Sequence, residues 1–341
     1  MTATILITGA SGLIGFRILI DAVTAGHNVH FTARSEAKAA LVSSNPAIKK
    51  LGLKEGQLTA FVIPDLTVEA AFDAPLKGAT HIIHAGSPVP VPTFDPTTQI
   101  YEPTIKISYS LLQSALKFPE IKRIGLTSSI VANTGLVPGP QTASAATRIA
   151  PPSPIPRSFN SAIEGYVTAK IIEMYNTDEL RKTQKPHFSI SYVVPGYTFG
   201  RNELILNTAM MSTENSSNNF LVMGITGIEL PFPIHGVAAH IDDVSATHLR
   251  VLFDEVCVGK DYGVATKVDY SMIFDIVSKA FPKAVEAGVF KKGACLRFKP
   301  STIRARQTSY SVGLRALRVR LWMWLRSILR SWARSWHKGM H

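Results

Sequence analysis

The sequence predicts an α/β fold built on a doubly wound parallel sheet. Short apolar, β-branched runs without a polar break are typical of strands buried on both faces of such a sheet. These runs alternate with segments of helical spacing, as β-α-β units require. We expect strands at residues 4–8, 28–33, 59–63, 80–85, 123–128 and 188–194, and helices that include 98–118 and 161–182.

The first of these units carries a glycine-rich turn. The strand "TILIT" leads into "TGASGLIG", with glycines at 9, 12 and 15, and a helical pattern then runs to Gly26. Such glycines permit a tight turn, a close backbone approach to a pyrophosphate and close helix–strand packing, while the helix N-terminus favours the anion. The motif therefore predicts a Rossmann-type dinucleotide site. A tight turn without a ligand is the alternative.

The second strand, "NVHFTA", ends at cations rather than at an acidic residue. Arg34 and Lys38 stand where an Asp or Glu commonly binds the ribose 2′-hydroxyl and where a cation accommodates a 2′-phosphate. The sequence therefore favours NADPH over NADH. The alternative is that both cations belong to a solvated helix start.

A tyrosine and a lysine lie four residues apart in the helix predicted at 161–182. Tyr166 and Lys170 therefore share one helical face. A phenol has an ordinary pKa of about 10, and a neighbouring cation favours its ionised form. Lys170 supplies that cation and could hold the nicotinamide ribose. Ser128 and Ser129 follow a strand at the ligand-binding edge of the sheet, where a hydroxyl could polarise a substrate carbonyl.

These motifs, in this order, resemble an extended short-chain dehydrogenase/reductase, close to the dihydroflavonol reductase and yeast methylglyoxal (aldehyde) reductase group. The matching segments span about residues 1–250 and read "TGASGLIG", "RSEAK", "PDL", "HAGSP", "LTSS", "YVTAK", "PGYTFG" and "HIDDVSATH". The resemblance implies Ser129, rather than Ser128, as the catalytic hydroxyl. It also implies Tyr166 as the proton donor and Lys170 as its activator.

The resemblance further implies which residues surround the cofactor. They are Thr8, Gly9, Ser11, Gly12, Leu13, Ile14 and Gly15 of the turn, Arg34 and Lys38 at the 2′-phosphate, Asp65 and Leu66 at the adenine, Ala85, Gly86 and Ser87 along the ribose, Pro195, Gly196 and Thr198 at the carboxamide, and Tyr166 and Lys170 themselves.

Some segments depart from the family or carry no family pattern. Gly86 stands where relatives commonly have Ala, and Ile107 where they often have Gly. The segment 133–160, with six prolines, is expected to be a loop and matches no family pattern, so the resemblance does not imply a substrate pocket. Asp242 and Asp243 precede a helical pattern and are expected at its N-cap.

Composition excludes several classes of protein. Apolar residues make up 46% and charged residues 18% of the 341 residues, the balance of a globular enzyme. Cys257 and Cys295 show no disulfide or zinc-ligand spacing, and His84, His240 and His248 are expected to be packed histidines, so we predict no metal. No signal peptide and no apolar run of ~18–20 residues is found, and a cytoplasmic protein is expected.

We expect three regions along the chain. Residues 1–195 would form the NADP-binding domain with the catalytic residues, 196–296 a smaller substrate-capping region, and 297–341 an atypical tail. The tail carries +11 of the net charge of +12, so the body is nearly neutral and nucleic-acid binding is not expected.

The tail itself allows several interpretations. Residues 314–336 have the pattern of a basic amphipathic helix, which could lie on an anionic membrane, dock in a partner's groove or pack on the body. An altered reading frame or a misassigned splice site would also produce this sudden loss of acidic residues.

The leading hypothesis is NADPH-dependent reduction of a ketone or aldehyde, or the reverse alcohol oxidation, by hydride transfer. The resemblance implies a small to medium, largely apolar carbonyl substrate, of the kind found in secondary metabolism. One alternative is an epimerase or dehydratase of a nucleotide-linked sugar, which recycles its nicotinamide. The other is an NADP-sensing regulator without catalysis.

Overall fold

The computed structural model describes residues 2–136, 142–207, 210, 215–228, 236–268, 270, 273–292 and 304–305. Its centre is a seven-stranded sheet in the order β10-β7-β5-β4-β1-β2-β3, in which every pairing is parallel. The predicted parallel α/β fold and its six predicted strands are confirmed, and β10 is a seventh. The strands are β1 (Thr4–Thr8), β2 (Asn28–Ala33), β3 (Leu58–Val62), β4 (His81–His84), β5 (Arg123–Thr127), β7 (Ser189–Pro195) and β10 (Tyr262–Val264).

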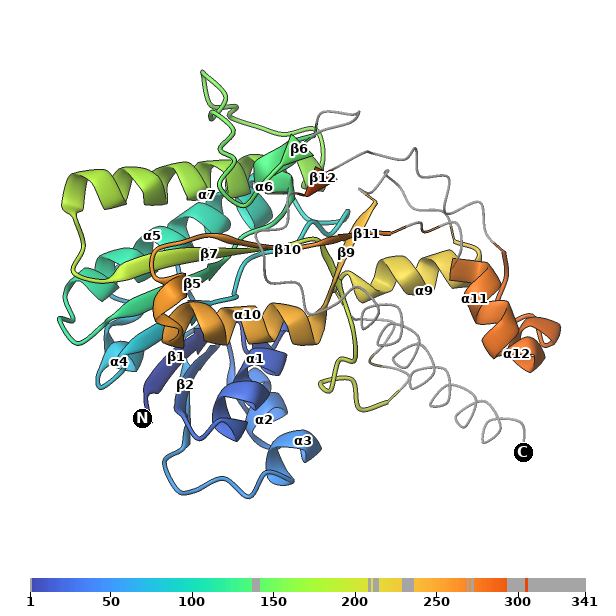
Figure 1. Ribbon diagram of the computed structural model, residues 1–341, viewed down its shortest axis with the longest axis horizontal. Helices are drawn as coiled ribbons and strands as arrows, with labels where there is room; N and C mark the ends of the chain where they lie inside the picture. Colours follow the sequence, from blue (N-terminus) through green and yellow to red (C-terminus); the bar gives the residue numbers. More distant parts are fainter. Residues whose placement is uncertain are drawn as a thin grey trace.

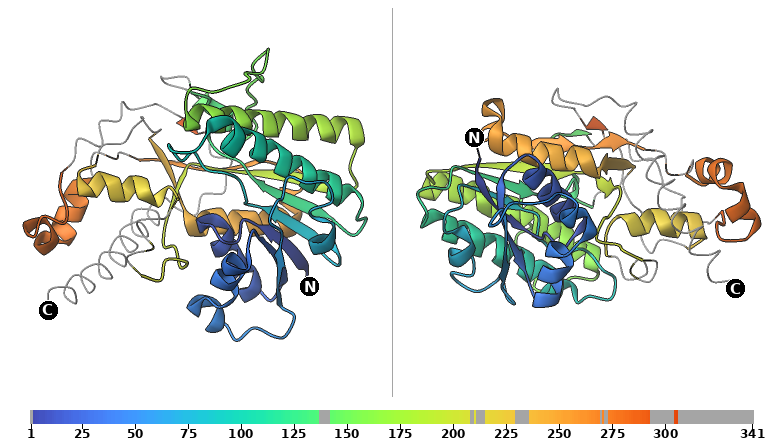
Figure 2. Two further views of the ribbon diagram at one scale, coloured as in Figure 1. Left: turned by 180° about the vertical axis from the view of Figure 1, so that it is seen from behind. Right: turned by 90° about the horizontal axis from the view of Figure 1, so that it is seen from below.

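Helices cover both faces of this sheet (Figure 1). On one face lie α1 (Leu13–Thr24) and α10 (Ile241–Phe253), and on the other lie α5 (Glu102–Leu116) and α7 (Ala162–Gln184). The view from behind in Figure 2 shows the same two layers. The shorter helices of this part are α2 (Glu36–Ser43), α3 (Pro46–Lys49), α4 (Asp73–Leu76), the π-helix η1 (Pro96–Tyr101), α6 (Val131–Thr134) and the 3₁₀ helix η2 (Glu255–Cys257).

A smaller mixed sheet follows β7. In it β8 (Tyr197–Phe199) pairs in parallel with β9 (Val237–His240), and β11 (Thr266–Lys267) pairs antiparallel with β9. Beside it in Figure 1 lie α9 (Asn218–Thr226), α11 (Ile273–Ala280) and α12 (Pro282–Glu286). A separate apolar cluster that includes Phe199, Tyr270 and Phe290 holds this region together.

Two predicted segments are only partly described. The proline-rich segment holds the two-residue strand β6 (Thr142–Ala143) and no other helix or strand over 144–160, as expected of a loop; residues 137–141 lie outside the described residues. Of the tail at 297–341, the structure describes only β12 (Arg304–Ala305), which pairs in parallel with β6. The amphipathic helix predicted at 314–336 lies outside the described residues, and the boundaries at 195 and 296 stay predictions.

Within the described part of the chain, no helix is long and apolar enough to cross a membrane.

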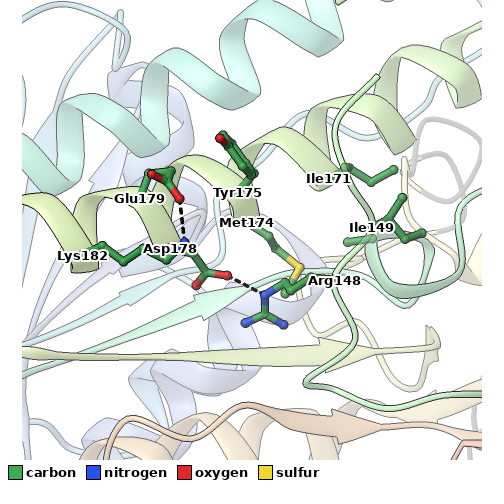
Figure 3. Close-up of a pocket in the computed structure, with 9 residues that line it drawn as sticks. Arg148, Ile149, Ile171, Met174, Tyr175, Asp178, Glu179 and Lys182 are labelled. Carbon is green, nitrogen blue, oxygen red and sulfur yellow. Dashed lines mark hydrogen bonds and ion pairs between the residues drawn. The ribbon is translucent and has the colours of Figure 1, made fainter. Parts of the chain in front are cut away.

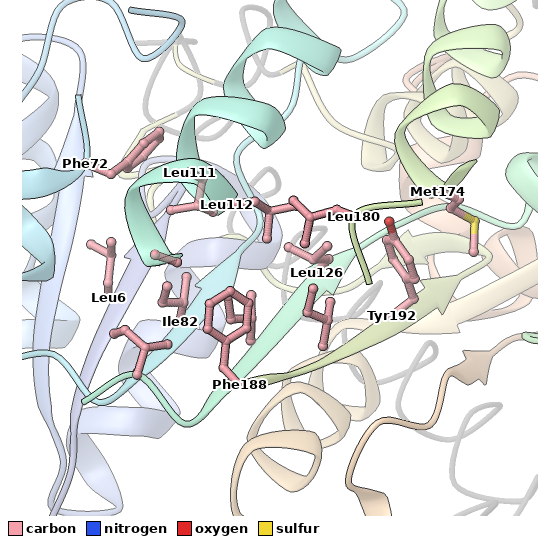
Figure 4. Close-up of a cluster of buried hydrophobic side chains, with 14 of the residues drawn as sticks. Leu6, Phe72, Ile82, Leu111, Leu112, Leu126, Met174, Leu180, Phe188 and Tyr192 are labelled. Atoms are coloured by element: carbon pink, nitrogen blue, oxygen red, sulfur yellow. The ribbon is translucent and has the colours of Figure 1, made fainter. Parts of the chain in front are cut away.

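The largest apolar cluster fastens α5 and α7 to the sheet (Figure 4). Burial of each such side chain contributes about 1.5–3 kcal/mol, so the cluster fixes the helix that carries Tyr166 and Lys170. Ile107 is partly buried and packs against this cluster. The labelled members are Leu6, Phe72, Ile82, Leu111, Leu112, Leu126, Met174, Leu180, Phe188 and Tyr192.

Local capping explains where two helices begin. The Ser161 hydroxyl accepts from the Glu164 N–H and caps α7, and the Glu164 carboxylate accepts at 2.8 Å from the N–H of Asn160, the residue before the cap. The prediction that Asp242 and Asp243 form the cap of α10 is wrong. His240 is the N-cap, because its Nδ1 accepts from the Asp242 N–H, and the two aspartates occupy the first turn, where the helix dipole favours negative charge.

Gly165 lets η1 pack directly on the start of α7. A Cβ at this position would lie 2.5 Å from the carbonyl oxygen of Pro96, which is backbone and cannot rotate away. Rings of Tyr101 and Phe159 meet beside this contact, with centroids 4.8 Å apart. The glycine before Tyr166 therefore sets how closely the two helices approach.

We expect Gly165→Ala to destabilise the fold by about 1–3 kcal/mol, because overpacking forces the backbone of η1 away from α7. Urea denaturation monitored by circular dichroism measures this loss. Gly263→Ala, on the edge strand β10, is the matched control, since the nearest atom to its Cβ is 3.9 Å away. Equal stability of both variants and the unaltered chain would contradict the close contact.

Three buried histidines make the fold sensitive to acid. Burial lowers the pKa of His81 to about 4 and the pKa values of His84 and His248 to about 3 each. The unfolded chain binds protons on these groups near the ordinary value of 6.5, so their contribution to stability is complete above that pH and is lost as pH falls from 6.5 toward 3. Burial raises the pKa of Glu203 and acts in the opposite direction.

Between pH 7.5 and pH 5.5 we expect the free energy of unfolding to fall by about 2–4 kcal/mol. Each histidine contributes about 1.4 kcal/mol at one pH unit below 6.5, and Glu203 offsets part of the sum. Urea denaturation at the two pH values gives the difference directly. A free energy that is the same at both would mean that these histidines are not held neutral inside the fold.

Candidate active site

The glycine turn between β1 and α1 is held by backbone contacts that exclude side chains. Gly9 has φ +73°, and a Cβ there would lie 2.6 Å from the Gly86 backbone. A Cβ on Gly15 would lie 2.2 Å from the Gly9 carbonyl oxygen, so α1 packs on the turn itself. A Cβ on Gly86 would lie 2.9 Å from the Gly9 nitrogen, so this glycine is confined as well.

Gly12 differs from its neighbours in the turn. It is the N-cap of α1, and a Cβ there would meet only the Gly9 carbonyl oxygen, at 3.4 Å, which is ordinary contact. Packing within the chain therefore does not demand a glycine at this position. A group that must approach the backbone at the helix N-terminus would demand one, and a dinucleotide pyrophosphate is such a group. The turn fits the cofactor that its sequence predicts.

Thr8 connects the ends of β1 and β4. Its buried hydroxyl lies 2.7 Å from His84 Nδ1 and accepts from the Gly86 N–H at 3.2 Å. His84 is fully buried, and burial together with the charge of Lys170 accounts for its low pKa. Ala85 also donates its N–H to the Thr8 carbonyl, while the Ser87 hydroxyl lies 3.4 Å from Thr104 Oγ1.

The residues predicted at the adenine end follow β2 and β3. Arg34 and Lys38 are exposed at the start of α2, where Ser35 caps the helix, and neither forms an ion pair with another described residue. Asp65 is exposed and accepts from the N–H and hydroxyl of Thr67, hydrogen bonds that lower the pKa of its carboxyl. Leu66 is half-buried against the cluster drawn in Figure 4.

Ser129, Tyr166 and Lys170 lie around the carboxyl end of β5. Lys170 donates to the Thr127 carbonyl oxygen at 3.3 Å, two residues before Ser129. Tyr166 is half-buried on the same face of α7, one turn before Lys170. Ser129 is half-buried, whereas Ser128 is 3% exposed and its hydroxyl has no partner among the described residues.

An apolar cluster surrounds Tyr166. Its buried members come from the segment that follows β5, from α7 and from β9, and Tyr166 packs against them. One side of the Tyr166 ring is therefore in contact with hydrocarbon. These residues are Ile130, Val131, Val167, Ile171 and Val237, with Ile149, Ile163 and Ala265 at the rim.

The end of β7 meets the smaller sheet. The Gly196 N–H donates to the Val264 carbonyl oxygen, and a Cβ on Gly196 would lie 3.3 Å from backbone of β9. The Pro195 carbonyl oxygen accepts from the Ile130 N–H, and this hydrogen bond connects the segment after β5 to β7. Thr198 is buried in β8 and donates to the Gly196 carbonyl oxygen.

Because all seven strands are parallel, their carboxyl ends meet at one edge of the sheet. Every predicted site segment follows one of these ends: 9–15 after β1, 34–38 after β2, 65–66 after β3, 85–87 after β4 and 128–129 after β5, with 195–198 at the end of β7. Tyr166 and Lys170 come to this edge from α7. Which of these side chains contact a cofactor or a substrate stays a prediction.

A cavity of about 140 Å³ lies beside α7 and shares Ile149 and Ile171 with the apolar cluster at Tyr166 (Figure 3). It is lined by Arg148, Ile149 and residues of α7 such as Met174, and by none of the residues predicted for the site. Arg148 is bound to Asp178 across it. Within the described residues, no group of three or more His, Cys, Asp or Glu side chains is placed to hold a metal ion.

The sequence reasoning missed one charged neighbour of the site. Glu173 is buried three residues after Lys170, and its Oε2 lies 2.7 Å from Lys170 Nζ. A spacing of three on a helix puts the two side chains on adjoining faces and was the available signal. The pairing of Thr8 with His84 had no such signal, because 76 residues separate them.

Comparison with known proteins identifies the family of the chain. The family model described as "NAD dependent epimerase/dehydratase family" matches residues 5–180. Ketoreductase sphI from Aspergillus fumigatus is 30% identical over 77% of this chain and 79% of its own length. The NAD-dependent epimerase/dehydratase ALT6 from Alternaria alternata is 28% identical over 82% of this chain and 83% of its own length.

Solved structures share the fold. Yeast methylglyoxal/isovaleraldehyde reductase Gre2, complexed with NADPH, superposes with a TM-score of 0.68 over 86% of each chain, at 19% identity. The model match covers more than half of the sequence, from β1 to within α7. The chain therefore belongs to the NAD dependent epimerase/dehydratase family, within the extended short-chain dehydrogenases/reductases.

Proposed function

We propose that the chain is an NADPH-dependent reductase of ketones or aldehydes, which would also catalyse the reverse alcohol oxidation. The observation that carries this proposal is the position of Lys170. Lys170 is 1% exposed, its ammonium lies at the carboxyl end of β5, and it is one helical turn from a half-buried tyrosine. A buried cation at this position would stabilise the phenolate that forms when Tyr166 gives up its proton.

In the proposed reaction, three side chains act on one carbonyl group. When bound, NADPH supplies the hydride to the carbonyl carbon. The Ser129 hydroxyl donates a hydrogen bond to the carbonyl oxygen, Tyr166 gives its proton to that oxygen, and the Lys170 ammonium stabilises the phenolate that remains. The net result is an alcohol from a carbonyl compound.

The surroundings of Tyr166 support an apolar substrate. The cluster that its ring packs against is built from Ile, Val and Ala side chains. Ketoreductases from Cercospora nicotianae (CTB6, 27% identical) and Aspergillus fumigatus are among the relatives. We infer a small to medium, largely apolar ketone or aldehyde, of the kind found in secondary metabolism.

A second candidate is epimerisation or dehydration of a nucleotide-linked sugar. The name of the Alternaria relative and the description of the family favour it. That chemistry returns the nicotinamide to its starting state, so it consumes no net NADPH. Loss of absorbance at 340 nm during turnover separates the two candidates.

We expect Tyr166→Phe to lower kcat for carbonyl reduction by roughly 10²- to 10⁴-fold, because the proton donor is removed while the ring stays. The dissociation constant for NADPH should change little. Turnover is followed by NADPH absorbance across a panel of apolar ketones and aldehydes, and binding by NADPH fluorescence. If the unaltered chain binds NADPH but turns over no carbonyl or sugar nucleotide, and the variant binds it equally, the protein is a sensor rather than an enzyme.

We also expect the paired substitution Arg34→Ala and Lys38→Ala to weaken NADPH binding by roughly 10- to 100-fold and to leave NADH binding unchanged. Each exposed cation would lose a charge-assisted contact with the 2′-phosphate. Titration of both dinucleotides by fluorescence checks this. Lys77→Ala is the matched control, because Lys77 is an exposed cation just before β4, at the opposite edge of the sheet. Equal losses for NADPH and NADH would argue against the assignment.

A further inference from the structure

Lys170 and Glu173 form an ion pair that is cut off from solvent. Their exposed fractions are 1% and 2%, and Lys170 Nζ lies 2.7 Å from Glu173 Oε2. The other ion pairs of α7 at a spacing of three, Asp178 with Arg181 and Glu179 with Lys182, are far less buried. Two charges taken out of water are costly, and removing one partner leaves the other without compensation.

One N–H of the Lys170 ammonium is not used by these contacts. An ammonium group has three N–H donors. Glu173 accepts one, and the Thr127 carbonyl oxygen at the end of β5 accepts another. Among the described residues no third acceptor is recorded for Lys170. The carboxylate and the carbonyl therefore fix the position of the nitrogen and leave one N–H for a ligand.

Within the described residues, the Glu173 carboxylate has Lys170 as its recorded protein partner. Its second oxygen, Oε1, is buried without a hydrogen bond. Glu173 also lines a cavity of about 20 Å³ between α5 and α7, with room for a single water molecule. The hydroxyls of Thr177 and Tyr192 both donate to the backbone carbonyl of Glu173, so they fix this turn of the helix without using the carboxylate.

Two buried titratable groups near the pair, on β4 and β7, carry no charge at neutral pH. His84 of β4 has a pKa of about 3, and burial raises the pKa of Tyr192 of β7 well above 10. Tyr109 of α5 is 60% exposed beyond the small cavity. Among the described residues, the Glu173 carboxylate is thus the group that balances the lysine charge.

We propose that Glu173 is a positioning residue for Lys170, whose carboxylate holds the ammonium at the end of β5 with one N–H free for the nicotinamide ribose and balances its charge there. This inference rests on the proposed function. It assigns to Glu173 no contact with substrate or cofactor.

The test compares Glu173→Gln with Glu179→Gln. The control removes a carboxylate from the same helix and from an ion pair of the same length, 2.7 Å, at the surface. For each protein we would measure the dissociation constant for NADPH by fluorescence, KM for a reducible carbonyl compound, and kcat for reduction as a function of pH.

For Glu173→Gln we expect NADPH to bind roughly three-fold more weakly, KM to stay within about two-fold, and the alkaline limb of kcat to move about one unit to lower pH. Without the Glu173 charge, the buried ammonium either loses its own proton at lower pH or favours loss of the Tyr166 proton at lower pH. Either change removes the enzyme form with a protonated Tyr166 beside a charged Lys170, which is the form that reduces a carbonyl. Glu179→Gln should match the unaltered chain in all three quantities.

A folded Glu173→Gln with an unchanged alkaline limb and unchanged NADPH affinity would overturn the inference, since a merely structural role moves neither. If Glu173→Gln does not fold, Glu173→Asp decides. It keeps the charge but shortens the reach to Lys170, so kcat should fall at unchanged KM, and full kcat would overturn the inference.

The outcome can be separated from that of the proposed function. If the unaltered chain binds NADPH but reduces no carbonyl compound, the proposed function fails, and the NADPH affinity of Glu173→Gln still decides the role of Glu173. If the unaltered chain binds neither NADPH nor NADH, both proposals fail.

Discussion

The contact between the backbones of Gly9, Gly86 and Gly15 is the constraint on which the rest of the structure depends. A single Cβ at any of the three would lie 2.9 Å or less from backbone of the neighbouring segment. A side chain there would push α1 away from the turn and separate the ends of β1 and β4. Thr8 and His84 could then no longer bond across those strands. Because Gly9, Gly15 and Gly86 carry no side chain, α1 and the ends of β1 and β4 can pack together at the edge of the sheet that holds the candidate site.

Beneath that edge, buried polar groups are bonded to one another across both layers of helices. Thr127 is the link: its carbonyl oxygen accepts from Lys170 of α7, and its hydroxyl lies 3.0 Å from His248 of α10. Those helices cover opposite faces of the sheet (Figure 1). Buried polar groups are costly unless they are bonded, so this line of contacts fixes the registration of α7 against the strands. The position of Lys170 is thereby set from two sides.

Much of this was predictable from the sequence, and the exceptions have physical reasons. The strand "TILIT" and the helix around Tyr166 follow from local apolar patterns, and the glycine turn follows from a local motif. β10 was missed because only three residues of it pair at the edge of the sheet. The cap of α10 was misassigned because a histidine takes the role that the neighbouring aspartates usually fill. Contacts such as Thr8 with His84 depend on strand order, which no short window of sequence contains.

The order of the strands also bears on how the chain forms as it is made. β2 and β3 add in turn to one side of β1, and β4, β5, β7 and β10 then add in turn to the other side. Each strand therefore emerges from the ribosome when its neighbour toward β1 already exists, and no pairing in this sheet has to wait for a segment synthesised later. Unpaired edges and long-range pairings are what expose a growing chain to misassembly. Here the sheet can widen outward from its first strand at the pace of translation.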